Sequence, residues 1–120
     1  MKRMMLVLIM LLSIACTGNA WTDEEIANAI FWSEGGYEAD YLYGIVSVSY
    51  DDIEEARRIC LNTIRNQRIR YKKDCENGYS EDFLTSLGDR YCPVEAHELN
   101  KYWLKNVKWF LNNPKEIVND

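Results

Sequence analysis

The sequence predicts a single, mainly α domain with one short extended or hairpin segment. Apolar residues recur at helical spacing in several segments, and capping residues stand at the starts of those segments. A β-branched and aromatic run over residues 41–50, interrupted by Gly44, predicts the extended segment. The sequence has no internal repeat and no low-complexity stretch, so we expect one compact domain.

Residues 1–20 have the pattern of a secretory signal. Basic residues at positions 2 and 3 precede an apolar run over residues 4–14, and small residues stand at positions 18–20. The apolar run is shorter than the roughly 20 residues that a membrane-spanning helix needs. We therefore predict a signal peptide over residues 1–20, a domain over residues 21–120, and export to the periplasm or the medium.

Cys16 allows an alternative interpretation of the same segment. Residues 12–16 (LSIAC) resemble a lipobox, with Ser13 where leucine is usually found. Cleavage before Cys16 and its lipidation would anchor the protein as a lipoprotein, in which case a peripheral scaffold is a further interpretation.

The charge and the aromatic content narrow the classes of partner. The full chain has a formal net charge of −5, and removal of residues 1–20 takes away two basic residues and no acidic one. An acidic domain lacks the basic footprint that general binding to nucleic acid or to anionic bilayers requires. Every Phe, Tyr and Trp lies outside residues 1–20, which favours a cleft with flat walls for sugars or peptides. We expect a monomer, with no stable membrane insertion unless Cys16 is lipidated.

Three cysteines remain after the signal, namely Cys60, Cys75 and Cys92. Export favours one disulfide, and of the three pairings we favour Cys60 with Cys92. No spacing among the cysteines and His97 resembles a zinc site, so we predict no metal and no cofactor.

The first predicted helix has the clearest boundaries. Thr22 and Glu25 form a capping-box pattern, and Gly35-Gly36 ends the helix. Its apolar face comprises Ile26, Ala27, Ile30, Phe31 and Trp32. Glu34 is thus a carboxylate at the carboxyl end of a mostly apolar helix, where the helix dipole disfavours negative charge.

Three more helices are predicted. The second starts at Asp51-Asp52 and runs to about Tyr71, with Glu54 facing Arg58 and an inward stripe of Ile53, Ala56, Cys60 and Ile64. A short helix over about residues 81–87 is stopped by Gly88. The last helix begins near Asn100, with inward residues Leu104, Val107, Phe110 and Leu111.

Glu34 is the first candidate for chemistry. A carboxylic acid that protonates a glycosidic oxygen near neutral pH needs a raised pKa, and both burial and an unfavourable helix end raise it. Phe31 and Trp32 supply apolar neighbours, and Gly35-Gly36 supplies an open approach. The alternative is a solvated glutamate in the last turn of a helix.

The chain resembles the lysozyme-like lytic transglycosylases. The resemblance is carried by residues 29–36 (AIFWSEGG) followed by Tyr43-Gly44-Ile45, and by residues 56–64, 87–93 and 99–107, in order along nearly the whole domain. Ser33 precedes the glutamate, whereas those enzymes usually have a serine after it, and no Gly-Leu-Met-Gln string occurs. The resemblance implies an α+β lysozyme-like fold.

It also implies an activity, which is cleavage of the β-1,4 bond between N-acetylmuramic acid and N-acetylglucosamine in peptidoglycan, with Glu34 as the single catalytic acid and base. A hydrolytic lysozyme would need a second carboxylate, and Asp40, Asp51 and Asp52 are the available residues. Asp51 and Asp52 are more simply helix caps. We therefore predict a lytic murein transglycosylase, with a lysozyme-type glycosidase as the close alternative.

Four further residues are candidates for substrate binding: Tyr43, Ser47, Tyr91 and Trp103. The tyrosines could hydrogen-bond Glu34 or an N-acetyl group, Ser47 could face the cleft, and Trp103 could stack on a sugar, as could Trp32. Each also has a structural interpretation, as core or as a polar strand position. The basic run over residues 65–73 is interpreted as a solvated helix face.

A different class of function explains the same composition. A non-enzymatic secreted module that binds a cell-wall component or a protein would also be exported and rich in aromatics. An enzyme requires Glu34 to be partly buried at the floor of a cleft, and a binding module does not.

Overall fold

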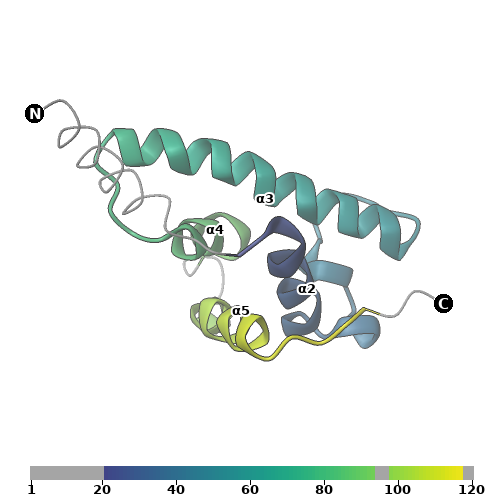
Figure 1. The fold of residues 1–120 in the computed structure, drawn as a ribbon. Coiled ribbons are helices and arrows are strands. Elements are labelled where there is room, and N and C mark those ends of the chain that lie inside the picture. Colours follow the sequence, from purple (N-terminus) through teal and green to yellow (C-terminus); the bar gives the residue numbers. More distant parts are fainter. Residues whose placement is uncertain (1–20, 94–97, 118–120) are drawn as a thin grey trace, which may run out of the picture.

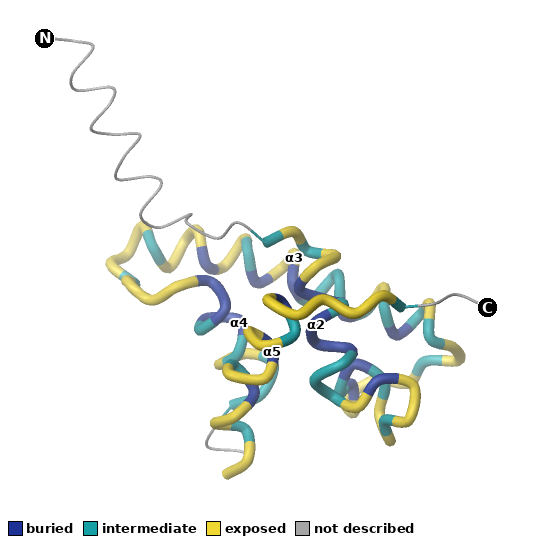
Figure 2. The backbone as a smooth tube through the Cα atoms, turned by 60° about the horizontal axis from the view of Figure 1, so that its bottom comes forward, coloured by how far each residue is buried: buried dark blue, intermediate teal, exposed yellow. Residues whose placement is uncertain are grey.

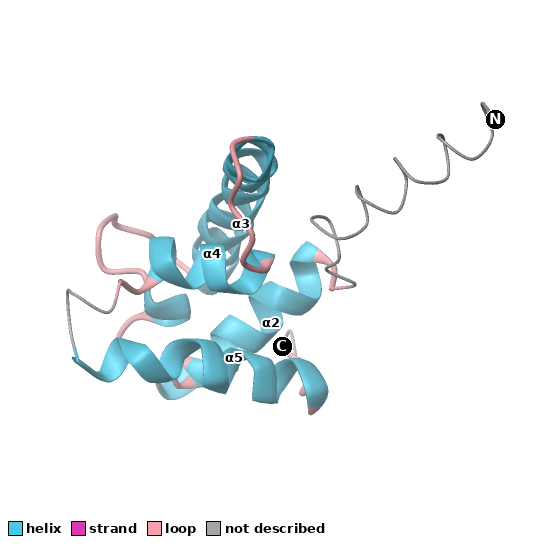
Figure 3. Ribbon diagram, turned by 90° about the vertical axis from the view of Figure 1, so that its left-hand side faces the viewer, coloured by secondary structure: helices cyan, strands magenta, loops and turns pink. Residues whose placement is uncertain are grey.

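The computed structural model describes residues 21–93 and 98–117. The predicted signal peptide, the lipidation alternative at Cys16, and His97 lie outside the described residues. The described part is mainly helical and forms one domain, as predicted, and it contains no β-strand (Figure 3). None of its helices is both long and apolar enough to cross a bilayer.

Helix α2 lies between α3 and α5, and α4 packs against α3 and α5 (Figures 1 and 3). The α-helices are α2 (Asp23–Ser33), α3 (Ile53–Glu76), α4 (Phe83–Tyr91) and α5 (Trp103–Asn112). Short 3₁₀ helices lie between them: η1 (Gly36–Glu38), η2 (Leu42–Gly44) and η3 (Glu98–Tyr102). The segment after α5 returns past α2 (Figure 1).

The core forms where the inward faces of the helices meet (Figure 2). The predicted stripe of α3 is confirmed at Ala56, Cys60 and Ile64, which are fully buried, while Ile53 is half-buried. The stripe continues to Gln67 and Tyr71. Other fully buried core residues include Ile26, Ile30, Phe31, Leu87 and Val107.

The predicted start of α2 is confirmed, since Thr22 and Glu25 form both hydrogen bonds of the capping box. α3 begins as predicted at an Asp52 cap, whose carboxylate accepts the Glu55 N–H at 2.8 Å. Its end is five residues later than predicted, at Glu76. The predicted pair of Glu54 with Arg58 is wrong, because Arg58 lies 3.7 Å from Glu55 instead.

The predicted extended or hairpin segment over residues 41–50 is not formed. Leu42–Gly44 is a 3₁₀ turn, and residues 45–50 are irregular. Tyr43 and Gly44 both have positive φ, of 58° and 71°, so the chain turns where a strand would continue. The part of the chain that is described offers no neighbouring strand with which residues 45–50 could pair.

Gly88 lies inside α4 and does not end it. A Cβ atom at Gly88 would lie 3.1 Å from Cε3 of Trp103, so the glycine lets the indole of α5 approach the helix closely. A glycine costs a helix about 1 kcal/mol relative to alanine, and here close packing compensates for it. α5 itself starts at Trp103, three residues after the predicted Asn100, with Val107 and Leu111 buried and Leu104 and Phe110 half-buried.

We expect Gly88→Leu to destabilise the protein by about 1–3 kcal/mol, because the added side chain overpacks against Trp103. Leucine is the better helix former, so propensity alone predicts the opposite sign. Thermal or urea denaturation measures the change. The control is Asp89→Ala at the exposed next position, which should leave the stability within about 0.5 kcal/mol. A more stable Gly88→Leu variant would contradict the packing role.

The predicted Cys60–Cys92 disulfide is absent, since both residues are free thiols. Cys60 is fully buried on α3, and its sulfur contacts the Tyr91 hydroxyl at 3.8 Å rather than a second sulfur. Cys92 is half-buried and follows the last residue of α4.

Candidate functional site

Glu34 is the C-terminal cap residue of α2. Its N–H donates to the Ile30 carbonyl at 3.0 Å, and the next residue, Gly35, has a φ of 112°, so the helix ends there. This confirms the predicted helix end. Because the helix ends here, the Glu34 side chain projects from the C-terminal cap position of α2 toward η2.

The Glu34 carboxyl group packs against the backbone of Gly44 in η2. A Cβ atom at Gly44 would lie 2.7 Å from Glu34 Cδ and 2.8 Å from Oε2. Only glycine leaves room for the carboxyl group, and a φ of 71° also favours glycine. The residue without a side chain next to the Glu34 carboxyl group is therefore Gly44, and not Gly35 or Gly36 as predicted. Gly36 instead makes room for Trp32, with which a Cβ atom at this position would collide.

Two tyrosines hold the turn that carries Gly44. The Tyr91 hydroxyl donates a hydrogen bond to the Tyr43 carbonyl. The Tyr43 ring is fully buried, and its hydroxyl accepts from Arg57 Nη1 at 3.3 Å; the same nitrogen donates to Asn28 at 2.7 Å. The hydroxyl groups of Tyr43 and Tyr91 thus bond to other partners than Glu34, and the buried Tyr43 side chain is not open to a ligand.

Burial raises the pKa of the Glu34 carboxyl above its ordinary value, and the indole N–H of Trp103 partly offsets this rise. Glu34 forms no ion pair within the described residues. The Trp103 Nε1 atom is buried and makes no hydrogen bond of standard geometry in the described structure. A carboxyl group without a cationic partner retains its proton to a higher pH, which is what a general acid requires.

The other ionisable groups beside Glu34 stay protonated at neutral pH. Burial raises the pKa of the Cys60 thiol to about 12. Burial also raises the pKa of Tyr91, and both burial and the charge of Glu34 raise the pKa of Cys92. A thiol that remains protonated is a poor nucleophile, so the chemistry of this cluster depends on Glu34.

The three residues that could supply the second carboxylate of a hydrolase are Asp40, Asp51 and Asp52, and each has surroundings different from those of Glu34. Asp52 is the N-cap of α3, as predicted, and the adjacent Asp51 donates its N–H to Glu55 Oε2 at 3.0 Å. Asp40 is exposed in the loop between η1 and η2. No carboxylate is among the groups that shift the pKa of Glu34. The site therefore contains one acidic group in the described structure.

A groove of about 390 Å³ runs from Gly44 along α3. Ser47 and Tyr91, two of the predicted binding residues, line it. The further lining residues are Gly44, Ile45, Val46, Ile59, Thr63, Asn66, Arg70 and Arg90. Sequence reasoning missed Thr63, Asn66 and Arg90 and interpreted Arg70 as part of a solvated face. Thr63, Asn66 and Arg70 recur at helical spacing on one face of α3, a signal that the sequence contains. Arg90 joins them only through the packing of α4 on α3.

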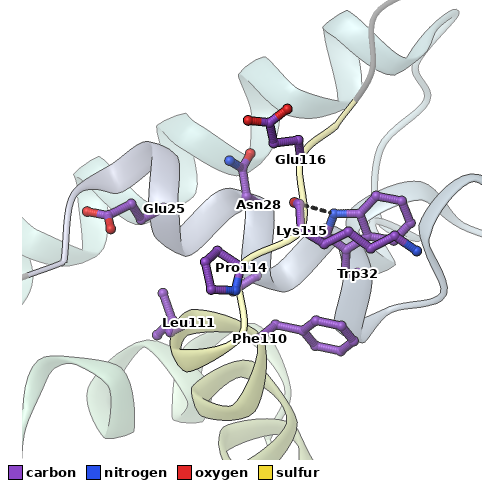
Figure 4. Close-up of a pocket in the computed structure, with 9 residues that line it drawn as sticks. Glu25, Asn28, Trp32, Phe110, Leu111, Pro114, Lys115 and Glu116 are labelled. Atoms are coloured by element: carbon purple, nitrogen blue, oxygen red, sulfur yellow. Dashed lines mark hydrogen bonds between the residues drawn. The ribbon is translucent and has the colours of Figure 1, made fainter.

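Trp103 and Trp32 do not offer a free ring face to this groove. Trp103 is 5% exposed and packs between Gly88 and Tyr91, so it is a core residue. Trp32 borders a separate cavity of about 100 Å³ (Figure 4). Its Nε1 donates to the Lys115 carbonyl at 2.8 Å, and Lys115 Nζ lies 4.1 Å from its ring centroid.

The basic run of α3 is divided between several roles. Arg68 pairs with Asp23 and stacks on Phe83, at 4.4 Å from the ring centroid. Arg70 lines the groove, so only part of the predicted solvated face is free. In the described residues, no three His, Cys, Asp or Glu side chains are grouped to hold a metal ion.

The fold and the site define a small helical protein with one partly buried glutamate beside a polar groove. Comparison of the chain with protein-family models, with curated proteins and with solved structures gives no match. The function therefore has to be argued from the site itself.

Proposed function

We propose that this protein cleaves the β-1,4 bond between N-acetylmuramic acid and N-acetylglucosamine in peptidoglycan, with Glu34 as the catalytic residue. The observation that carries the proposal is the position of the Glu34 carboxyl, which is partly buried, has a raised pKa and contacts Gly44, a residue that lines an open groove. A glycan strand in the groove would lie next to this proton donor.

Glu34 would act twice in the reaction. Its protonated carboxyl first donates a proton to the glycosidic oxygen that leaves. The resulting carboxylate then accepts the proton of the muramyl 6-hydroxyl group, whose oxygen attacks the anomeric carbon and closes a 1,6-anhydro ring. No water is consumed, and the carboxyl group ends in its starting state.

The single acidic group favours this transglycosylase reaction over hydrolysis. A retaining hydrolase holds a second carboxylate at about 5–5.5 Å and an inverting one at about 6.5–9.5 Å. Asp52 caps α3, and its carboxylate already accepts the Glu55 N–H. Because peptidoglycan lies outside the cytoplasm, the proposal includes export to the periplasm or the medium, with anchoring at Cys16 as the alternative.

Mass spectrometry of the products tests the proposal. Purified sacculi incubated with the protein should release muropeptides with 1,6-anhydro ends, each lighter by one water than the product of a hydrolytic lysozyme run in parallel. Reducing ends would instead make the protein a lysozyme-type hydrolase. The absence of any released product would contradict the activity and favour the non-enzymatic binding module.

We expect Tyr91→Phe to lower muropeptide release by about tenfold, because the turn that places Gly44 against Glu34 loses its hydroxyl anchor. The lost hydrogen bond should also cost about 1 kcal/mol of stability. The control is Tyr79→Phe, which removes a buried hydroxyl that has no hydrogen-bond partner in the described structure. Equal activity of the two variants would show that the Tyr91 hydroxyl does not position the site.

A further inference from the structure

Two arginines line the groove beside Glu34. Arg70 on α3 and Arg90 on α4 both line it, although the chain as a whole is acidic, with a formal net charge of −5. Among the described residues that line this groove, none is acidic. Two guanidinium groups in such a groove create a positive potential that attracts an anion.

Both arginines are available to a ligand. They are exposed, and neither forms an ion pair within the described part of the chain. The side chain of Arg70 has one long hydrogen bond, at 3.4 Å to Gln67 Oε1. By contrast, Arg58 and Arg68 are paired with the carboxylates of Glu55 and Asp23.

The groove is continuous with the catalytic position. Gly44 contacts the Glu34 carboxyl group and also lines the groove, so one residue separates Glu34 from the groove that the arginines line. Ser47 and Thr63, which also line the groove, offer hydroxyl groups to the amides or hydroxyls of a substrate. The groove thus combines two guanidinium groups with neutral polar groups next to the turn that contacts the proton donor.

We propose that Arg70 and Arg90 recognise a carboxylate carried by the lactyl arm of the muramyl residue. This inference rests on the proposed function. The sugar rings of a peptidoglycan strand are uncharged, and its carboxylates lie on the lactyl arm, either in the attached stem peptide or, where the peptide has been removed, on the lactyl group itself. A guanidinium group binds a carboxylate through two parallel hydrogen bonds.

The test compares three substrates: native sacculi, sacculi whose carboxylates have been converted to amides with carbodiimide and ammonia, and amidase-treated strands that keep only the lactyl carboxylate. We expect the double variant Arg70→Gln/Arg90→Gln to release muropeptides about tenfold more slowly than the wild type from native sacculi, and within twofold of it from amidated sacculi. An equal loss on these two substrates would overturn the proposal.

The third substrate identifies which carboxylate is recognised. In native sacculi the lactyl carboxyl is in an amide bond, so a loss there reports a carboxylate of the stem peptide. A loss that persists on amidase-treated strands shows that the arginines also bind the freed lactyl carboxylate, and a loss confined to native sacculi restricts them to the stem peptide. Arg70→Lys/Arg90→Lys keeps the charge but loses the paired hydrogen bonds, so its rate on native sacculi should lie between those of the wild type and the glutamine variant. The matched control Arg58→Gln/Arg65→Gln removes the same charge from another surface and should behave as the wild type on native sacculi.

A binding measurement separates this inference from the proposed activity. Co-sedimentation of the Glu34→Gln protein with insoluble native and amidated sacculi needs no catalysis. We expect the Glu34→Gln protein to bind amidated sacculi more weakly than native sacculi. Adding Arg70→Gln/Arg90→Gln should remove this difference between the two substrates. That result supports carboxylate recognition even if no product is ever released. Equal binding to both substrates would remove the arginines from recognition, whatever the activity.

Discussion

Glu34→Gln is expected to lower muropeptide release from purified sacculi by at least about 100-fold, because the amide cannot donate the proton that the leaving oxygen needs. The substitution keeps the size of the side chain, so the contact with Gly44 is retained. Release is measured by chromatography of the soluble products. The control is Glu38→Gln in η1, an exposed carboxylate whose loss should leave the rate unchanged. Activity near the wild-type level would remove Glu34 from the mechanism.

The stability of Glu34→Gln should depend on pH in a defined direction. Because the folded state raises the pKa of this carboxyl group, the wild-type protein is penalised as the pH rises from the unfolded pKa through the folded one. The variant lacks this penalty. Its thermal stability should equal that of the wild type at about pH 4, and equal or exceed it at neutral pH. Burial would be contradicted as the cause of the raised pKa if the variant matched the wild type at low pH but were less stable than the wild type at neutral pH.

Gly44→Ala is expected to have the second largest effect. A Cβ atom 2.7 Å from Glu34 Cδ forces the carboxyl group away from its position, and displacement of a catalytic group by about 1 Å costs on the order of 100-fold in rate. Alanine at a positive φ also costs about 1–2 kcal/mol of stability. Activity assays on sacculi and thermal denaturation measure the two effects separately.

Gly78→Ala is the matched control for this substitution. Gly78 also has a positive φ, of 100°, but a Cβ atom there meets nothing within 4 Å. Both alanine variants should therefore lose a similar amount of stability, and only Gly44→Ala should lose activity. If the two variants lose activity equally, the effect of Gly44 comes from backbone strain and not from its contact with Glu34.

Local signals in the sequence predicted much of the helical structure. The capping box at Thr22, the cap at Asp52 and the apolar stripe through Ala56, Cys60 and Ile64 are all confirmed. These features depend on hydrogen bonds within one turn and on a helical period, which neighbouring residues determine. The raised pKa of Glu34 was also expected, and burial is the cause that raises it.

The errors fall where distant segments meet. Gly88 has the sequence pattern of a helix stop, yet α4 continues because the glycine accommodates Trp103 from another helix. The run over residues 41–50 has strand propensity, yet the anchor from Tyr91 to the Tyr43 carbonyl holds it in a turn. A glycine or a β-branched run is compatible with several local conformations, and the residues that pack against it decide which one forms.

The sequence by itself determined the helical class, the starts of α2 and α3 and the place of Glu34 at the end of α2, since each follows from contacts a few residues apart. Only the tertiary structure decided that Gly44 lies against the Glu34 carboxyl, that Trp103 is in the core, and that Arg70 and Arg90 share one groove. The physical reason is that burial, a shifted pKa and a groove arise from groups far apart in the chain, whose meeting depends on how whole helices pack.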